Sequence, residues 1–173
     1  MHAAAIFLPQ FSKMLTNLKL WLEEAKETAE GREFDPNNLV ASRLAPDMFT
    51  LTRQVQSSCD TAKFTAARLS GTEAPSHPDT EATLEELVAR IDSVVAYLDG
   101  FEATAFDEAL DRTLTLNFMG GATAKGSDYL VEFAMPNFYF HLSMAYAILR
   151  NSGVKLGKRR FLGHVTLGAP VES

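Results

Sequence analysis

Apolar residues recur with a helical period along most of the chain. Between residues 6 and 30 they return every three or four positions, which places them on one face of a helix of about six turns. Lysines and glutamates occupy the other face, and Gly31 is the expected C-terminal stop. The pattern predicts a long amphipathic helix with these buried positions: Phe7, Phe11, Met14, Leu15, Leu18, Leu22 and Ala25.

The same period predicts two further helices in the middle of the chain. The second spans about residues 47–70, and small residues on its inward stripe allow neighbouring helices to approach closely. The third spans about residues 80–99, with Asp79 or Thr80 as its N-cap. A glycine follows each of them, which is typical of a helix C-terminus.

The last part of the chain combines a short extended segment with a fourth helix. Residues 113–118 alternate polar and apolar side chains and precede Gly120–Gly121, so they predict a short hairpin or an extended crossover. The fourth helix spans about residues 127–151. Because proline removes a backbone hydrogen bond and clashes with the preceding turn, Pro136 predicts a kink near residues 132–136.

Four long amphipathic helices indicate an all-α fold. We expect an antiparallel four-helix bundle with a short extended crossover or hairpin before the last helix. A length of 173 residues suits a single domain over residues 1–173, with its core at about residues 6–163. Residues 164–173 are expected to form a frayed tail.

Composition narrows the classes of function. The net charge of −6 disfavours nucleic-acid binding, because phosphate contacts need a basic surface. No window approaches 18 uninterrupted apolar residues, so we expect no membrane span, and the N-terminus lacks the features of a secretory signal. The lone Cys59 excludes an internal disulfide and fits a cytoplasmic protein. Its mid-helix, apolar position favours inert packing over nucleophilic chemistry.

His141 is the most informative candidate for chemistry. It lies in the apolar run MPNFYFHLSMAYAILR, one helical turn after Asn137 and on the same inward face. A buried imidazole needs a hydrogen-bond partner or a metal ion. One interpretation is a core histidine that is satisfied by Asn137 or by a backbone carbonyl. The other is one ligand of a metal site, which usually needs three or more strong ligands.

The second helix offers polar residues that could face His141. Gln54, Gln56, Ser58 and Asp60 are the candidates, and Gln54 flanks the apolar stripe, so it could point inward. The alternative is that they are boundary or solvated positions. For Asp60, a surface ion pair with Lys63, three residues on, is a sufficient explanation.

Aromatic residues are dense around His141. Core and interface packing is the simpler explanation, but a hydrophobic pocket for a small ligand is the functional alternative. In that pocket His141 and the Tyr146 hydroxyl would be the catalytic polar groups, with Asn137, Gln54, Tyr139 and Phe133 as lining residues. Tyrosines on the outer face could instead mark a dimer surface.

Two smaller features have mainly structural interpretations. The basic cluster Lys155, Lys158, Arg159 and Arg160 complements a helix C-terminus, with an anionic substrate or cofactor as the sharper alternative. His77 and His164 read as exposed unless the fold returns them to the core.

The helix NFYFHLSMAYAILRNSGV resembles the last helix of the DinB/YfiT-like bundles, and RLAPDMFTLTRQVQSSCDTAK resembles their second helix. Together, APDMF, PNFYFH and AYAILR resemble a branch of that superfamily known only as a domain of unknown function. The resemblance implies an often dimeric bundle with three histidines on a divalent metal such as zinc or nickel, which activates a low-molecular-weight thiol for transfer or isomerisation. His141 matches one of those histidines. Asn137 stands at the second, and Gln54 or another residue at the third.

Two functional hypotheses follow. In the first, the protein is a metal- or thiol-cofactor-dependent transferase or isomerase with a degenerate metal site, and His141 is a ligand or general base that Asn137 and Gln54 hold. In the second, it is a non-catalytic bundle that binds a small ligand or a partner protein, and His141 is only hydrogen-bonded. The sequence leaves open whether it is an enzyme, and a homodimer is expected in both cases.

Overall fold

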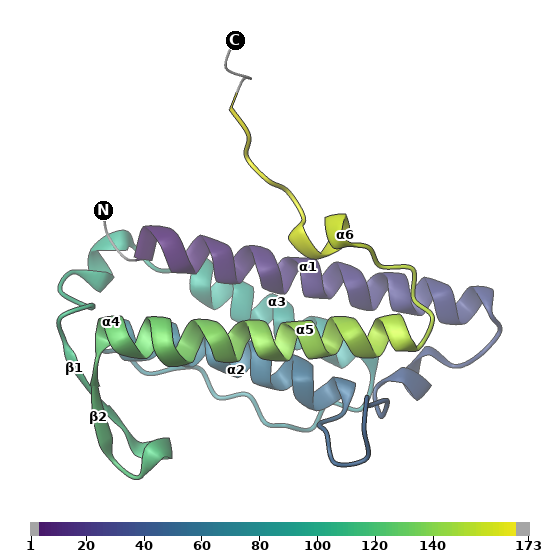
Figure 1. Cartoon of the computed structure of the whole chain (residues 1–173), viewed down its shortest axis with the longest axis horizontal. Coiled ribbons are helices and arrows are strands. Elements are labelled where there is room, and N and C mark those ends of the chain that lie inside the picture. Colours follow the sequence, from purple (N-terminus) through teal and green to yellow (C-terminus); the bar gives the residue numbers. More distant parts are fainter. Residues whose placement is uncertain (1–3, 169–173) are drawn as a thin grey trace.

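The computed structural model describes residues 4–168, and residues 169–173 of the expected tail lie outside the described part. Four long helices lie side by side along a common axis (Figure 1): α1 (Ala4–Gly31), α2 (Leu51–Ser70), α3 (Leu84–Asp99) and α5 (Met135–Asn151). The fold is therefore all-α, a four-helix bundle with a small hairpin. No helix in residues 4–168 is both long and apolar enough to cross a membrane.

Side-chain pairs between helices define their directions. Polar links at seven-residue intervals run antiparallel between α1 and α3: Ser12–Asp99, Lys19–Asp92 and Lys26–Glu85. Helices α2 and α5 are likewise antiparallel, as the site contacts below show. Helices α2 and α3 run in the same direction, so the connection 71–83 travels the length of the bundle (Figure 1). A seven-residue interval is two helical turns, which keeps each set of links on one face.

Both middle helices begin later than their patterns suggested. Helix α2 begins at Leu51 because the Thr50 side chain caps it, accepting a hydrogen bond from the Arg53 amide. Helix α3 begins at Leu84 because Thr83 and Glu86 form a complete capping box. The expected starts near residues 47 and 80 were therefore wrong.

The predicted fourth helix is one helical run in three parts. A short turn, α4 (Gly126–Asp128), leads into the π-helix η4 (Tyr129–Ala134), and α5 follows. The disturbance expected before Pro136 takes the form of this π-helix. Since proline has no N–H to donate, wider turns before it remove the need for one hydrogen bond of the α pattern.

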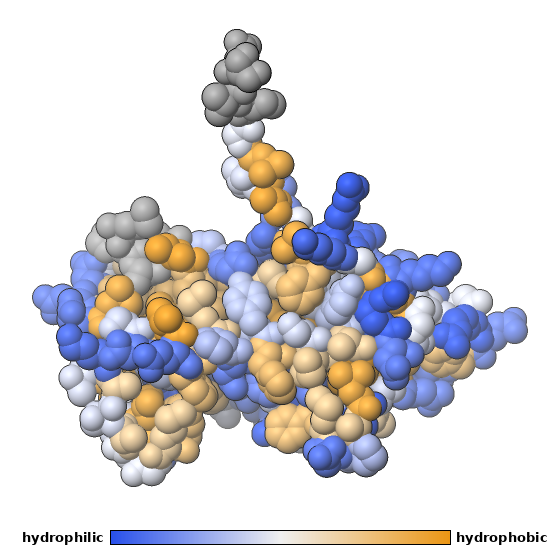
Figure 2. Space-filling model, in the orientation of Figure 1, coloured by the Kyte–Doolittle hydropathy of each residue, from blue (hydrophilic) through white to orange (hydrophobic). Residues whose placement is uncertain are grey.

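The hairpin stays at one end of the bundle (Figure 1). Strands β1 (Thr113–Leu116) and β2 (Ala122–Lys125) pair antiparallel, with Leu116 opposite Ala122. The turn between them contains the 3₁₀ segment η3 (Asn117–Met119), and Phe118 and Met119 at this tip are about half exposed. Figure 2 shows apolar surface over this region and over the adjoining face of the fourth helical run.

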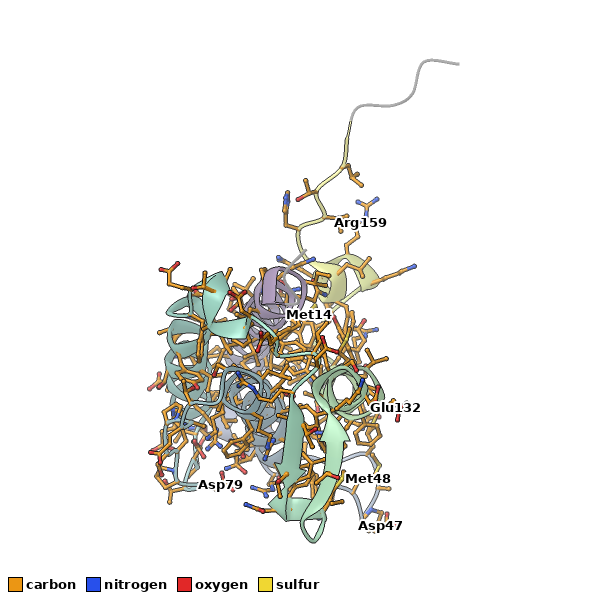
Figure 3. All side chains as sticks on the ribbon, turned by 90° about the vertical axis from the view of Figure 1, so that its left-hand side faces the viewer. Met14, Asp47, Met48, Asp79, Glu132 and Arg159 are labelled. Carbon is orange, nitrogen blue, oxygen red and sulfur yellow. The ribbon has the colours of Figure 1, made fainter. Side chains whose placement is uncertain are left out.

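The core fills the space between the four helices. Seen end-on, the side chains converge there, with Met14 of α1 pointing inward and Asp79 at the edge of the molecule (Figure 3). The short 3₁₀ segments η1 (Pro36–Leu39) and η2 (Ala103–Phe106) close the ends of the bundle, and Leu39 and Phe106 are buried.

Part of the C-terminal segment packs on α1. In α6 (Lys158–Leu162), the Phe161 ring stacks on Trp21, and the Trp21 Nε1 donates to the Arg160 carbonyl at 3.0 Å. Beyond Gly163, residues 164–168 extend away from the bundle (Figure 1).

Candidate functional site

A pocket of about 230 Å³ opens between α2 and the fourth helical run. One face of α2, the π-helix η4, the start of α5 and the hairpin tip form its walls. Hydrogen bonds join the two sides: His141 with Gln54, Asn137 to Thr61, Arg68 to Tyr129, and a longer one of 3.4 Å between Thr65 and Tyr129. Residues 54, 61 and 68 are seven apart, so they lie on one face of α2. Thr61 and Arg68 line the pocket, whereas Gln54, predicted as a lining residue, is buried against His141 and does not line it.

His141 lies at one end, and its ring orientation is set by Gln54. Its Nδ1 is 2.8 Å from Gln54 Oε1, and both residues are buried. An amide oxygen only accepts hydrogen bonds, so Nδ1 carries the proton and Nε2 has the free lone pair. The Phe49 ring lies parallel to the imidazole at 6.3 Å and further restricts it.

The Nε2 atom of His141 is an unused acceptor in the pocket lining. His141 lines the cavity, and Nε2 has no hydrogen bond to any residue between 4 and 168. Burial and the positive charge of Arg53 lower the pKa of His141 below its ordinary value of 6.5. The imidazole is therefore neutral at pH 7, in the form that accepts a proton at Nε2.

Asn137 lies beside His141 but bonds elsewhere. Its Nδ2 donates to Thr61 Oγ1 at 2.7 Å. The expectation that Asn137 would satisfy His141 was therefore wrong, because Gln54 reaches the ring from the facing helix. Both Asn137 and Phe133 line the pocket, as the sequence suggested.

The structure does not bring the two predicted tyrosines, Tyr146 and Tyr139, to the pocket. The Tyr146 hydroxyl donates to the Leu156 carbonyl at 3.1 Å, and its ring packs on Trp21. Tyr139 accepts a hydrogen bond from Gln10 of α1 at 2.7 Å. Both side chains project toward α1 or the C-terminal segment, because they lie on other faces of α5 than His141.

Sequence reasoning missed the opposite end of the pocket. There Arg68 donates to the Tyr129 hydroxyl at 2.9 Å. Its guanidinium also lies over the rings of Phe118, Phe64 and Tyr129, with its central carbon 4.7, 5.1 and 5.7 Å from their centroids. The seven-residue spacing of Gln54, Thr61 and Arg68 was the available signal. Nothing in the sequence pattern placed Phe118 of the hairpin here.

The donor set does not fit the divalent metal that the resemblance implies. In residues 4–168, no group of three or more His, Cys, Asp or Glu side chains is placed to hold a metal ion. His141 offers one lone pair at Nε2, Gln54 Oε1 already bonds to the other ring nitrogen, and Asn137 offers only one amide oxygen. Zinc and nickel sites in proteins rely on stronger imidazole, thiolate or carboxylate donors.

A second polar cluster lies on another face of α2, toward α3. Arg90 of α3 has a side chain that is only 1% exposed, and it binds Asp60 at 2.7 Å, Glu81 at 2.8 Å and Asp79 at 3.1 Å. Lys63 also pairs with Asp60, at 2.9 Å. That pair was expected at the surface, but the Lys63 side chain is 3% exposed because the connection 71–83 covers it. We call these five residues the Arg90 cluster.

His77 also belongs to this covered region. Its Nδ1 lies 3.2 Å from Lys63 Nζ and its Nε2 lies 2.9 Å from Ser93 Oγ, so both ring nitrogens contact other side chains and the ring is only partly exposed. The arrangement resembles a hydrolase triad, but Lys63 can only donate. His77 Nε2 must then carry the proton and cannot take one from Ser93, which excludes it as a base for that serine.

The remaining sequence candidates are structural or exposed. Cys59 is fully buried, and burial raises the pKa of its thiol to about 12, consistent with inert packing. Of the basic cluster, Arg160 pairs with Glu24 at 2.8 Å, and Lys155, Lys158 and Arg159 are exposed. His164 is exposed on the projecting segment.

Comparisons with known proteins agree with this fold. The chain is similar to a crystal structure of a DinB family member protein from Shewanella denitrificans, with 45% identity and a TM-score of 0.90 over 94% of this chain and 93% of that one. These values define the class as a DinB-like helical bundle. A search of curated proteins gave no match.

Within that class the chain belongs to the family described as Domain of unknown function (DUF1993), whose profile matches residues 2–162. The resemblance inferred from residue patterns is therefore confirmed, both for the superfamily and for its branch. The match extends over α1 to α6, so it includes the pocket and the Arg90 cluster.

Proposed function

We propose that the pocket binds a small organic ligand and that His141 Nε2 accepts a hydrogen bond, or the proton itself, from a hydroxyl or thiol group of that ligand. The observation that carries this proposal is the Gln54–His141 hydrogen bond of 2.8 Å. It leaves the lone pair on Nε2 in a residue that lines the cavity. Nearby aromatic walls suit an apolar ligand body, and few polar groups fix its orientation.

The catalytic form of this proposal is general base catalysis in a transfer or isomerisation. The O–H or S–H proton of the ligand moves to Nε2, which leaves an oxyanion or thiolate on the ligand and an imidazolium on His141. Gln54 Oε1 then accepts a charge-assisted hydrogen bond from Nδ1–H. A low-molecular-weight thiol would be activated in this way by the imidazole alone.

In the non-catalytic form of the proposal, the ligand donates the same hydrogen bond to His141 Nε2 and no reaction follows. In that case Nε2 positions the ligand donor but does not remove its proton. The favourable observation is that Asn137 Nδ2 already donates to Thr61 Oγ1 at 2.7 Å, which holds the Asn137 amide in place, while His141 Nε2 stays free as an acceptor at this end of the pocket.

Titration with para-ethylphenol tests the binding proposal. This probe combines a flat apolar ring with one hydroxyl donor, and we expect saturable binding with a dissociation constant of about 1 mM or tighter. His141→Asn should weaken binding at least tenfold, on the order of one lost hydrogen bond. His164→Asn is the matched control, because that histidine is exposed outside the pocket.

Calorimetry gives the affinity, and ¹⁵N NMR of His141 shows whether Nε2 is the contacted atom. Equal affinity in the His141→Asn variant would refute the proposal. Thiolate absorbance of bound para-thiocresol then separates the two forms. A thiolate fraction that rises on binding to the wild-type protein, but not to His141→Asn, indicates proton transfer rather than binding alone.

A further inference from the structure

Arg68 is a cation without a counter-ion in an acidic protein. The chain has 22 Asp+Glu against 16 Lys+Arg, yet no carboxylate within residues 4–168 forms an ion pair with Arg68. Its Nη1 donates to Tyr129, whereas its Nη2 and Nε form no hydrogen bond in that part of the chain. Arg68 also lines the pocket, so these free donors are available to a bound molecule.

The guanidinium of Arg68 is held in place before any ligand arrives. Three aromatic rings from α2, η3 and η4 surround it at 4.7–5.7 Å, and the Tyr129 hydroxyl fixes one nitrogen. A planar guanidinium with donors already oriented matches the two oxygens of a carboxylate. Restricting the side chain in advance also reduces the entropy that a ligand must overcome.

The other charges of the pocket do not oppose an anion at this end. Asp60 lines the cavity, but Arg90 and Lys63 both bind its carboxylate, so two buried cations face its one negative charge. His141 is neutral and lies at the far end. Arg68 is therefore the free positive charge of the pocket.

The two ends are far apart along the fourth helical run. Tyr129, which holds Arg68, and His141 are twelve residues apart, a helical rise of roughly 18 Å that the side chains on each side shorten. Between them lie the rings of Phe64 and Phe133 and the Asn137–Thr61 pair. The shape is that of an elongated site with charge at one end and a proton acceptor at the other.

We infer that Arg68 is the anion-binding end of this pocket and that its ligand is an elongated amphipathic carboxylate. The carboxylate binds the Arg68 guanidinium, an apolar body lies along the aromatic walls, and a hydroxyl or thiol donor reaches His141 Nε2. This inference rests on the proposed function, because it assigns the ligand class of the same pocket.

Paired probes of increasing chain length test the inference. The para-hydroxyphenylalkanoates carry the carboxylate, and the corresponding amides have the same shape without the charge. At the best chain length we expect the acid to bind at least tenfold more tightly than its amide. In Arg68→Gln this preference should vanish while the affinity for the amide is unchanged, and Arg68→Lys should restore part of it.

Arg112→Gln is the matched control, because that guanidinium bonds to the Leu69 carbonyl outside the pocket. Equal binding of acid and amide to the wild-type protein would overturn the inference and leave the proposed function standing, as would an acid preference that persists in Arg68→Gln. If both probes fail while para-ethylphenol binds, the inference again falls alone. If para-ethylphenol fails as well, the proposed function falls with it.

Discussion

Helix α2 presents polar residues to two regions that differ in how fully their charges are satisfied. Toward α3, Arg90 is surrounded by three carboxylates and Gln56 donates to Glu81 at 2.8 Å. Toward α5, Arg68 has only a hydroxyl and three rings, and Gln54 satisfies one nitrogen of His141 while the other stays free. In the first region every charged side chain is paired within the protein, although Arg90 Nε is buried without a hydrogen-bond partner in residues 4–168. In the second region a cation has no carboxylate partner and one imidazole nitrogen has no hydrogen bond.

This difference separates structural polar groups from binding groups. A buried charge must be paired, and the Arg90 cluster does this internally so that the connection 71–83 can cover it. A binding pocket needs the reverse, that is, oriented polar groups whose partners come from the ligand. Two arginines and two glutamines of one small bundle thus serve opposite purposes, and matched substitutions can test that division.

The largest expected effect is on stability, from Arg90→Met. Loss of this cation leaves Asp60, Asp79 and Glu81 without their shared partner. Breaking a buried ion pair typically costs about 3–5 kcal/mol, and because these carboxylates keep some contact with water we expect about 3 kcal/mol. Arg68→Met removes stacking and one hydrogen bond only, for which we expect about 1 kcal/mol.

Urea denaturation of both variants measures these free energies of unfolding. Binding of para-ethylphenol should be retained in both, since neither substitution changes the His141 end. A loss below about 1 kcal/mol for Arg90→Met, or a larger loss for Arg68→Met than for Arg90→Met, would contradict the division into a structural and a binding region.

The two glutamines give a sharper comparison with a smaller effect. Gln54→Leu leaves the buried Nδ1–H of His141 without an acceptor, which costs about 1–3 kcal/mol and frees the ring to change tautomer. Gln56→Leu removes a partner of Glu81 and Arg53 at a similar cost. Only Gln54→Leu should also weaken binding of para-ethylphenol, because part of His141 leaves the tautomer in which Nε2 is the acceptor.

Denaturation and calorimetry on the same two samples make this test. Long-range ¹⁵N correlation spectra report the His141 tautomer directly, and we expect one tautomer in the wild-type protein and a mixture in Gln54→Leu. If both variants bind the probe like the wild-type protein, the orientation of His141 by Gln54 has no role in binding.

The fold was predictable because it depends on local patterns that repeat. Apolar spacing located the four helices, alternation located the hairpin, and Pro136 located the irregular turn. Helix starts were missed where a cap decides them: the Thr83–Glu86 capping box was overlooked in favour of Thr80, which has no acidic residue three positions on. The proline locates the irregular turn but does not specify its form, which the structure shows to be a π-helix.

The site was predictable only in part, for a related reason. His141, Asn137, Gln54 and Phe133 lie on inward or boundary positions of their own helices, so helical spacing found them. The hydrogen-bond partners of these residues depend on how the helices are aligned with one another, which the sequence does not show. Asn137 was therefore expected to bond to His141, whereas it bonds to Thr61. Arg68 looked like an ordinary basic residue in the last turn of a helix, since its missing counter-ion becomes visible only after every carboxylate has been placed.

The smallest expected effect is on the pH dependence of stability, to which His141 of the pocket and His77 of the covered region contribute separately. Burial and the charge of Arg53 lower the pKa of His141, and burial with the charges of Lys63 and Arg90 lowers that of His77. As pH falls through the ordinary histidine pKa of 6.5, these histidines become protonated in the unfolded chain but remain neutral in the folded protein. The free energy of unfolding therefore declines from pH 6.5 toward the lowered values.

Each histidine contributes its own share to that decline. His141→Asn should remove the part of the pH dependence of the free energy of unfolding that comes from the pocket. His77→Asn should remove the part that comes from the covered region. Urea midpoints measured at a series of pH values below 6.5 test both. A lower window belongs to Asp79 and Glu81: burial raises their pKa, but hydrogen bonds from Arg53 and Arg90 outweigh it and lower the net value. Stability should fall again as these carboxylates take up protons.

Binding of para-ethylphenol adds a readout that only the pocket can move. Protonation of Nε2 removes the acceptor, so affinity should fall below pH 6.5 in the wild-type protein and in His77→Asn alike, as His141 gains its proton. A binding profile that stays flat to the onset of unfolding would show that the Nε2 lone pair does not hold the ligand. A profile altered by His77→Asn would show that the two faces of α2 are coupled rather than independent.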